Sequence, residues 1–194
     1  MVTSAGTRTT SRTDRRITQA ILTGAVSGVI ASLVMAMFAM IASVTYQGHG
    51  FFTPLYHIAS VFISPMTLMA SMQAGMTGSA FYFSFGPAVL GAVIHMMVGA
   101  GYGAVFAVAV NMLKRSGPML LALGLLWGAL VFLFSAFVAL PVMAAIFSSG
   151  DQITHMAQLA GWGTFFTEHL IFGLVLGALL MWRARSSSRV FASA

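Results

Sequence analysis

Long apolar runs alternate along this chain with segments that contain Gly, Pro or polar residues, and four of the runs are long enough to cross a bilayer. They cover about residues 17–46, 87–112, 119–140 and 162–182. A membrane-spanning helix needs roughly 20 predominantly apolar residues, and each run meets that requirement. The pattern therefore predicts an all-α integral membrane protein, a four-transmembrane-helix bundle that forms a single membrane domain over residues 17–183.

Two segments between the spans have the features of short helices. Residues 51–75 contain a Thr-Pro pair at 53–54 and a Ser-Pro pair at 64–65, and each pair places an N-cap residue before a first-turn proline. The other segment, residues 142–160, includes an amphipathic stretch. Helices this short cannot cross about 30 Å of hydrocarbon. We therefore expect short interfacial helices on the extracytoplasmic side.

The basic residues fall into three clusters: Arg8, Arg12, Arg15 and Arg16; Lys114 and Arg115; and Arg183, Arg185 and Arg189. Short cytoplasmic loops carry an excess of Lys and Arg. Four spans place all three clusters on one side, whereas an odd number would leave one cluster on the other. We expect a multi-pass protein of the cell (inner) membrane with cytoplasmic termini, namely a disordered basic tail over residues 1–16 and a second tail over 184–194. The composition of the first tail is also typical of an organelle transit peptide.

Composition narrows the class of protein further. The chain is 59% hydrophobic and 6% charged, with a mean hydropathy of +0.94, whereas a soluble domain carries about a quarter charged residues. The lipid bilayer is thus the expected partner. Nucleic acid is not, because no basic patch is interleaved with exposed aromatic residues. The absence of cysteine excludes disulfides, thiolate metal sites and cysteine nucleophiles.

Every predicted span contains two glycines four residues apart: Gly24 and Gly28, Gly99 and Gly103, Gly124 and Gly128, and Gly173 and Gly177. Small residues at this spacing let membrane helices approach closely. A first hypothesis is therefore a structural or interaction protein that packs through its Gly-xxx-Gly faces, as a homo-oligomer or within a larger membrane complex. The two halves show no clear sequence repeat, so an inverted-repeat transporter is not supported.

Two histidines and one glutamate lie inside the predicted spans, and they are the strongest functional signal in the chain. Counted from the span starts at 1.5 Å per residue, His95 lies at a depth of about 12 Å and His169 at about 10 Å, with Glu168 beside His169. Ionisable groups in a membrane are costly and usually face a partner or a cavity. If spans two and four are neighbours, the two imidazoles could face each other.

Three interpretations of these residues remain open. In the first, Glu168 and the histidines form a structural hydrogen-bonded network. In the second, His95 and His169 bind haem b or a transition metal such as copper or zinc, with Glu168 as a ligand or as the partner of a ligand. In the third, the same residues relay protons or bind a transported cation. The second interpretation uses glycines on the same faces to leave room for a planar macrocycle: Gly91, Gly99, Gly173 and Gly177.

A separate metal hypothesis concerns the segment between the first two spans. Thioethers suit Cu(I) and imidazole suits copper, so an extracytoplasmic copper site could combine four methionines at helical spacing with one upstream histidine: Met66, Met69, Met72, Met76 and His57. The same methionine stripe would equally serve as the lipid-facing side of an interfacial helix, because Met is a common apolar filler.

Catalytic motifs are missing from the sequence. It contains no Gly-rich phosphate loop of P-loop spacing, no His-Glu-x-x-His motif and no serine nucleophile elbow. Ser135 is the one hydroxyl residue of the predicted third span, and no base can be assigned to it. We therefore expect a protein that is not an enzyme.

Overall fold

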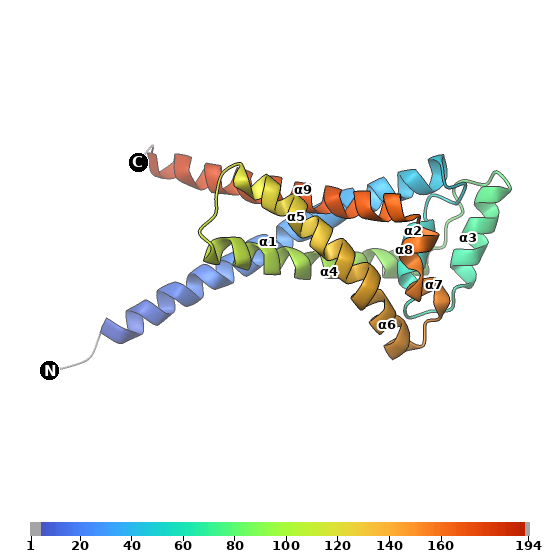
Figure 1. Ribbon diagram of the computed structural model, residues 1–194, viewed down its shortest axis with the longest axis horizontal. Helices are drawn as coiled ribbons and strands as arrows, with labels where there is room; N and C mark the ends of the chain where they lie inside the picture. The colour runs from blue at the N-terminus through green and yellow to red at the C-terminus, as the bar shows by residue number, and fades with distance from the viewer. Residues whose placement is uncertain (1–4, 193–194) are drawn as a thin grey trace.

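The computed structural model describes the backbone of residues 5–192 and the side chains of residues 14–186. Every element in this part of the chain is a helix (Figure 1). Four helical stretches are long and apolar enough to cross a membrane: Asp14–Thr45, Phe85–Met112, Met119–Phe147 and Trp162–Ser186. The prediction of an all-helical chain with four candidate spans is confirmed.

Four long helices form the bundle: α1 (Ala5–Thr45), α4 (Phe85–Met112), α5 (Met119–Phe134) and α9 (Trp162–Ala192). The π-helix η1 (Ser135–Ala139) and α6 (Leu140–Phe147) continue the stretch that α5 begins. The remaining helices are short, namely α2 (Thr53–Ala59), α3 (Met66–Met76), α7 (Asp151–Thr154) and α8 (Met156–Leu159). We call these four short helices the cap, because they lie at the end of the bundle opposite to the chain termini (Figure 1).

The two ends of the chain are more helical than the sequence predicted. Helix α1 begins at Ala5 and α9 continues to Ala192, so most of the segments 1–16 and 184–194 are extensions of spans and not separate tails. No proline interrupts either segment, and arginine is a good helix former, so each helix propagates outward from its span. Residues 1–4 and 193–194 of the expected tails lie outside the described residues.

The sequence predicted that the third span ends before Pro141. In the structure the helical stretch continues past this proline to Phe147. A proline normally breaks an α-helix because it removes a backbone donor and crowds the preceding turn. Here the backbone N–H of Leu140 donates to the carbonyl of Ser135, five residues back, which is the π-helical pattern. Pro141 then falls in the first turn of α6, where its missing N–H is tolerated. Residues 142–147, expected in an interfacial segment, therefore prolong the span.

Two pairs of helices in the bundle cross at glycines, and we call these two contacts the glycine crossings. Helix α1 packs against α4, and α5 packs against α9. A Cβ atom added at Gly28 would collide with the backbone oxygen of Gly99, and one added at Gly124 would collide with that of Gly173. The backbones of the paired helices are therefore in direct contact, as small residues permit in membranes.

All four Gly-xxx-Gly pairs take part in these two crossings. Gly24 and Gly103 meet in the first, and Gly177 meets the backbone of Leu120 in the second. The glycine faces are thus covered by helices of the same chain. This removes the basis for the hypothesis that these faces pack against a partner.

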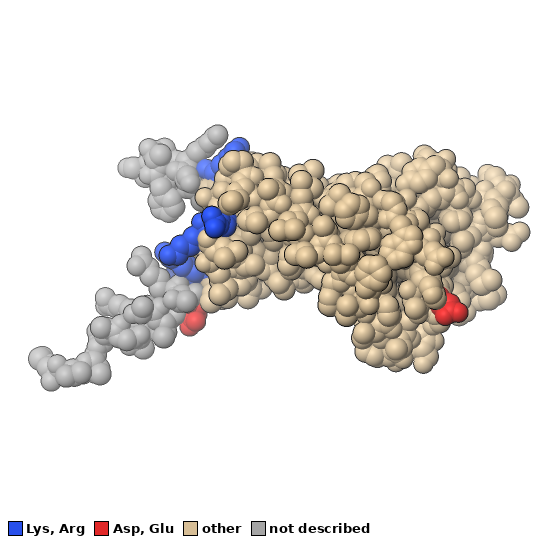
Figure 2. Space-filling view, viewed as in Figure 1, with Lys and Arg blue, Asp and Glu red and all other residues tan. Residues whose placement is uncertain are grey.

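The described basic side chains gather at one end of the bundle. Figure 2 shows Lys and Arg at the end that carries both termini, which we call the terminal end. The basic pair that follows α4, Lys114 and Arg115, lies at this end, where Arg115 and Arg16 line one shallow hollow. Asp151, by contrast, begins α7 in the cap. The described members of the three basic clusters therefore share one end of the molecule, as their placement in the sequence predicted.

Candidate functional site

A cavity of about 430 Å³ lies between the helices on the cap side of the glycine crossings. Residues of α1, α2, α4, α9 and the η1–α6 stretch line it, and most of the lining is apolar. Four histidines and one carboxylic acid also line it: His49, His57, His95, His169 and Glu168. Its volume is within the range of about 300–1,000 Å³ that is usual for small-molecule sites.

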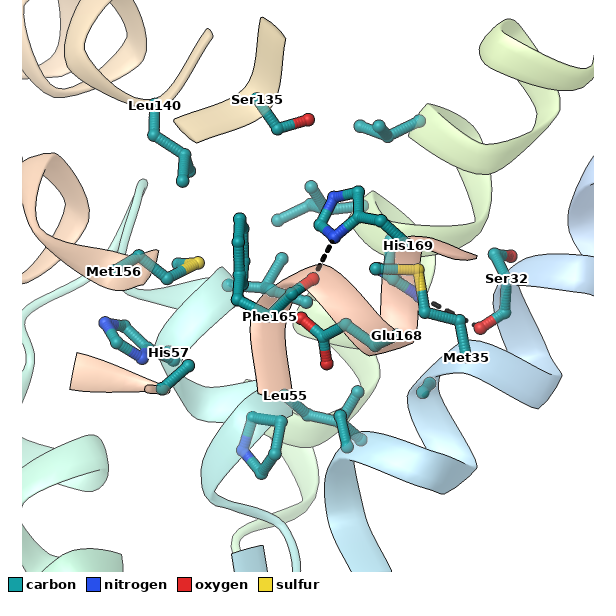
Figure 3. A pocket seen from close by; sticks show the side chains of 18 of the residues that line it. Ser32, Met35, Leu55, His57, Ser135, Leu140, Met156, Phe165, Glu168 and His169 are labelled. Atoms are coloured by element: carbon teal, nitrogen blue, oxygen red, sulfur yellow. Dashed lines mark hydrogen bonds between the residues drawn. The ribbon is translucent and has the colours of Figure 1, made fainter. Parts of the chain in front are cut away.

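Glu168 has the least compensated polar side chain of the cavity. It lies on the buried stripe of α9 that also carries Phe165, Phe172 and Leu176, and only 6% of it is exposed. Among the described residues, none forms a hydrogen bond or an ion pair with its carboxyl group. In Figure 3 the carboxyl group points into the cavity, on the same side of α9 as Leu55 of α2. An isolated ionised carboxylate in such surroundings is strongly unfavourable, so Glu168 needs either a proton or a cation.

His169 is held in one orientation by its own helix. Its Nδ1–H donates to the carbonyl oxygen of Phe165 at 2.6 Å, and its ring packs edge-on against Phe132, with centroids 6.0 Å apart. The side chain is buried, with 4% exposed. Because Nδ1 carries the proton of the neutral ring, Nε2 is left as an acceptor.

His95 is oriented by a different helix. Its Nε2–H donates to the carbonyl oxygen of Ser32 in α1 at 2.9 Å, which leaves Nδ1 as the free acceptor of the neutral ring. Helices α4 and α9 are not each other's main neighbours, because α4 packs mainly against α1 and α9 mainly against α5. Nevertheless, His95 and His169 line the same cavity and are close enough to interact electrostatically. The structure therefore brings together His95, His169 and Glu168, the three residues selected from the sequence.

His57 belongs to the cap, outside the membrane spans. Its Nε2–H donates to the carbonyl oxygen of Gln152 in α7 at 2.7 Å, so it joins the two parts of the cap. Burial lowers the pKa of the imidazole below its usual value of 6.5; the hydrogen bond to Gln152 opposes this shift and neighbouring His49 adds to it. His57 is thus a buried link within the cap that also borders the cavity.

The methionines of the proposed copper site are not gathered around His57. Met66, Met69 and Met76 are 61–70% exposed on the outward face of α3, whereas Met72 packs into the core of the cap beside Leu68. The stripe follows the surface of an exposed helix, as expected for apolar filler residues.

The glycines expected to leave room for a macrocycle are covered by backbone or by a small side chain. Gly91 lies against the carbonyl of Leu55, Gly99 against Ser32, and Gly173 against the backbone of Gly124. These positions therefore offer no slot for a planar cofactor. The reason is that close approach of helix backbones supplies much of the packing in membranes, and glycine permits it.

A three-ligand metal centre does not fit the residues either. Among the residues that the structure describes, no three His, Cys, Asp or Glu side chains lie close enough together to hold a metal ion. Zinc sites use three or four protein ligands. Two imidazoles with one acceptor nitrogen each, and a carboxyl group without a partner, are better suited to hydrogen bonding and charge recognition.

Tyr102 also lines the cavity, although the sequence did not single it out. Its hydroxyl lies 3.5 Å from that of Ser135 in η1, at the place where α4 and η1 meet. Tyr102 follows His95 by seven residues, which places both residues on one helix face. That spacing is the signal by which it could have been found.

No protein-family model matches the chain, and neither a curated protein nor a solved structure matches it. Function therefore has to be argued from the cavity. Its chemistry combines an apolar lining, one buried carboxyl group and two imidazole acceptors. Such a site can hold an apolar molecule that carries one positive charge or a few hydrogen-bond donors.

Proposed function

We propose that this membrane protein binds an apolar molecule with a single cationic group in the cavity, in exchange for a proton carried by Glu168. The proposal rests on one observation: Glu168 is a buried carboxyl group, without a partner among the described residues, in an otherwise mostly apolar cavity. It is the form of the third interpretation, proton or cation binding, that these surroundings favour.

The energetics support exchange over simple binding. Two opposite charges 4 Å apart attract by about 4 kcal/mol at an effective dielectric constant of 20, so a cation can take the place of the proton on Glu168. The apolar part of the same molecule gains roughly 25 cal/mol for each Å² removed from water. His95 and His169 each keep one ring acceptor for donors on the ligand. A structural network is less well supported, because such a network would satisfy the carboxyl group internally.

The test is a titration of the purified protein with benzyltrimethylammonium in weakly buffered detergent solution. We expect saturable binding and the release of about one proton per ligand, because one carboxyl group changes its counter-ion. Glu168→Gln should lower the affinity about tenfold or more, the equivalent of 1.4 kcal/mol, and should abolish proton release.

Two controls make this result specific. Asp151→Asn removes an exposed carboxylate of the cap and should change neither affinity nor proton release. Neopentylbenzene, the uncharged isostere of the probe, should release no proton. Binding of the cation by Glu168→Gln with unchanged affinity would refute the proposed function.

We further propose that the terminal end faces the cytoplasm of the inner membrane, so that the cap and its short helices lie on the extracytoplasmic side. The gathering of Lys and Arg at the terminal end supports this orientation, because cytoplasmic loops are enriched in these residues. Alkaline phosphatase fused after Arg115 should be inactive, and the same reporter fused after Gly150 should be active. The reverse pattern would overturn the orientation.

A further inference from the structure

The two halves of the chain share a pattern that the structure makes recognisable. In α4 and α9 a histidine is followed by glycines four and eight residues later: His95, Gly99 and Gly103, and His169, Gly173 and Gly177. In the cap, Leu-Tyr-His-Ile-Ala at 55–59 corresponds to Ile-Thr-His-Met-Ala at 153–157. The correspondence is not evident from the sequence because the spacing differs: His95 follows His57 by 38 positions, whereas His169 follows His155 by 14.

The contacts of the two halves correspond as well. Gly28 of α1 meets Gly99, and Gly124 of α5 meets Gly173, so each first helix meets the glycine that lies four residues after the histidine. Helices α1 and α5 run from the terminal end to the cap, and α4 and α9 run back (Figure 1). The halves therefore correspond in helix direction and in glycine contacts, as the parallel repeats of some transporters do. The cavity lies between them.

The repeats differ at one contact. Helix α9 of the second half packs closely against α1 of the first, whereas the corresponding pair, α4 and α5, shares few contacts. The hydroxyls of Tyr102 and Ser135 approach within 3.5 Å. The α5–α6 stretch runs obliquely to α4 (Figure 1), so on the cap side of this contact the two separate.

The cavity reaches the membrane-facing surface at this separation. Met97 and Val98 of α4 line the cavity, yet their side chains are 62% and 49% exposed. Across the gap, Ala139 at the end of η1 also lines it. We call this gap between α4 and η1 the side opening. All three residues beside it are apolar, so a hydrocarbon chain can lie there.

Hydrogen bonds link the elements above the cavity. His57 donates to Gln152 across the two parts of the cap. Gln47, just after α1, donates to the carbonyl oxygen of Ala160 at 2.6 Å, and Tyr46 and Thr164 are joined through their hydroxyls at 3.0 Å. These bonds tie the elements on the cap side together, where Phe62 and Leu159 also line the cavity and are 47% and 48% exposed. The side opening, by contrast, faces the bilayer.

Because the side opening between α4 and η1 is apolar and faces the bilayer, we infer that the ligand is a membrane-dissolved amphiphile. It enters through the side opening and binds with its cationic headgroup at Glu168 and its hydrocarbon tail in the opening. The inference rests on the proposed function, because it assumes the cation site at Glu168. It adds the source of the ligand and the presence of a tail. A long tail need not fit the cavity of about 430 Å³, because it extends into the lipid.

A cross-link across the side opening tests the inference. The chain has no cysteine, so a Val98→Cys/Ala139→Cys variant can be joined specifically with a bis-methanethiosulfonate. Each position lies one helical turn on the cap side of the Tyr102–Ser135 contact. The matched control is Tyr46→Cys/Thr164→Cys, which joins the residue after α1 to α9 where their side chains already touch, at the cap end of the cavity. Equilibrium binding of labelled tetradecyltrimethylammonium and benzyltrimethylammonium is measured in phosphatidylcholine nanodiscs.

The cross-link at the side opening should weaken binding of tetradecyltrimethylammonium about tenfold or more, because the tether obstructs the position of the tail. Benzyltrimethylammonium has no tail, so its affinity should change less than about twofold. The control cross-link should affect neither probe, and reduction should restore the original affinities.

The contrary outcomes separate the two proposals. Unchanged tetradecyltrimethylammonium binding after cross-linking, or equal loss of both probes, overturns the side opening while leaving the cation site in place. Loss of binding with the control cross-link alone would instead assign access to the cap. A protein that binds neither probe before cross-linking overturns the proposed function and this inference with it.

Discussion

The terminal half of the bundle and the half beside the cap are built from the same apolar residue types but differ in packing. In the terminal half, the helix pairs cross at glycines with their backbones in contact, and residues such as Phe106 and Leu176 fill the core. Beside the cap, α5 continues obliquely through η1 and α6, and a cavity with ionisable side chains remains. The comparison indicates that glycine lets the helices close together, whereas Glu168 and the histidines mark the region in which they stay apart.

The largest effect is expected from adding one methyl group at a glycine crossing. A Cβ at Gly103 would lie 2.7 Å from the Cα of Gly28 and would collide with the Gly24 carbonyl. Both are backbone atoms, so neither can move aside as a flexible side chain would. We expect Gly103→Ala to lower the free energy of unfolding by about 3 kcal/mol, the upper part of the range for overpacking. Thermal denaturation in detergent would measure the loss.

Gly101 supplies the matched control two residues earlier in the same helix. A Cβ there meets no atom within 4 Å. Gly101→Ala should therefore leave stability unchanged or raise it by up to about 1 kcal/mol, because alanine favours the helix more than glycine does. Equal destabilisation by both variants would show that helix closeness at Gly103 is not what stabilises the terminal half.

The half of the bundle beside the cap can be tested by removing its buried carboxyl group. If Glu168 serves ligand binding and not packing, Glu168→Leu should raise the free energy of unfolding of the ligand-free protein by about 1–2 kcal/mol, because an unpaired polar group is no longer buried. The same variant should lose the binding of benzyltrimethylammonium. Chemical denaturation in detergent would measure the gain. A clear loss of stability would instead support the structural network.

A smaller effect concerns pH and the link across the cap. Burial lowers the folded-state pKa of His57 below 6.5, so between these two values the unfolded chain binds a proton that the folded chain does not. The titration of His57 therefore leaves the free energy of unfolding unchanged above about pH 6.5. Below that pH it lowers the free energy of unfolding by at most about 1.4 kcal/mol per pH unit. His57→Gln should reduce the fall in Tm between pH 7 and pH 5.5.

Two further histidines define the comparison for that experiment. Burial also lowers the pKa of His49, so part of the acid sensitivity should remain in His57→Gln. His155 occupies the position of the second half that corresponds to His57 but is exposed, so His155→Gln is the control for replacing a cap histidine by glutamine. Equal slopes for wild type and His57→Gln would exclude His57 as a source of acid sensitivity.

Much of the fold could be predicted because a bilayer permits few solutions. Apolar length identifies the spans, and the backbone inside each must satisfy its own hydrogen bonds as a helix. Rise per residue then placed His95 and His169 at matching depth, and the structure brings them to one cavity. The third span was wrongly predicted to end at Pro141. The helix continues because the N–H of Leu140 donates to the carbonyl of Ser135 in a π-helical turn, and residue preferences do not reveal such a hydrogen bond.

The glycines illustrate what the sequence left open. Gly99 and Gly173 suited a helix crossing and a cofactor slot equally well, and only the position of the neighbouring backbone decides between them. Local apolar length and helical rise were enough to predict four spanning helices, their alternating directions and the matching positions of His95 and His169 along them. The tertiary structure alone decided which faces meet, that α4 and η1 stand apart, and that Glu168 lies in a cavity. Contacts between distant segments are set by the packing of whole helices, and no local pattern in the chain records them.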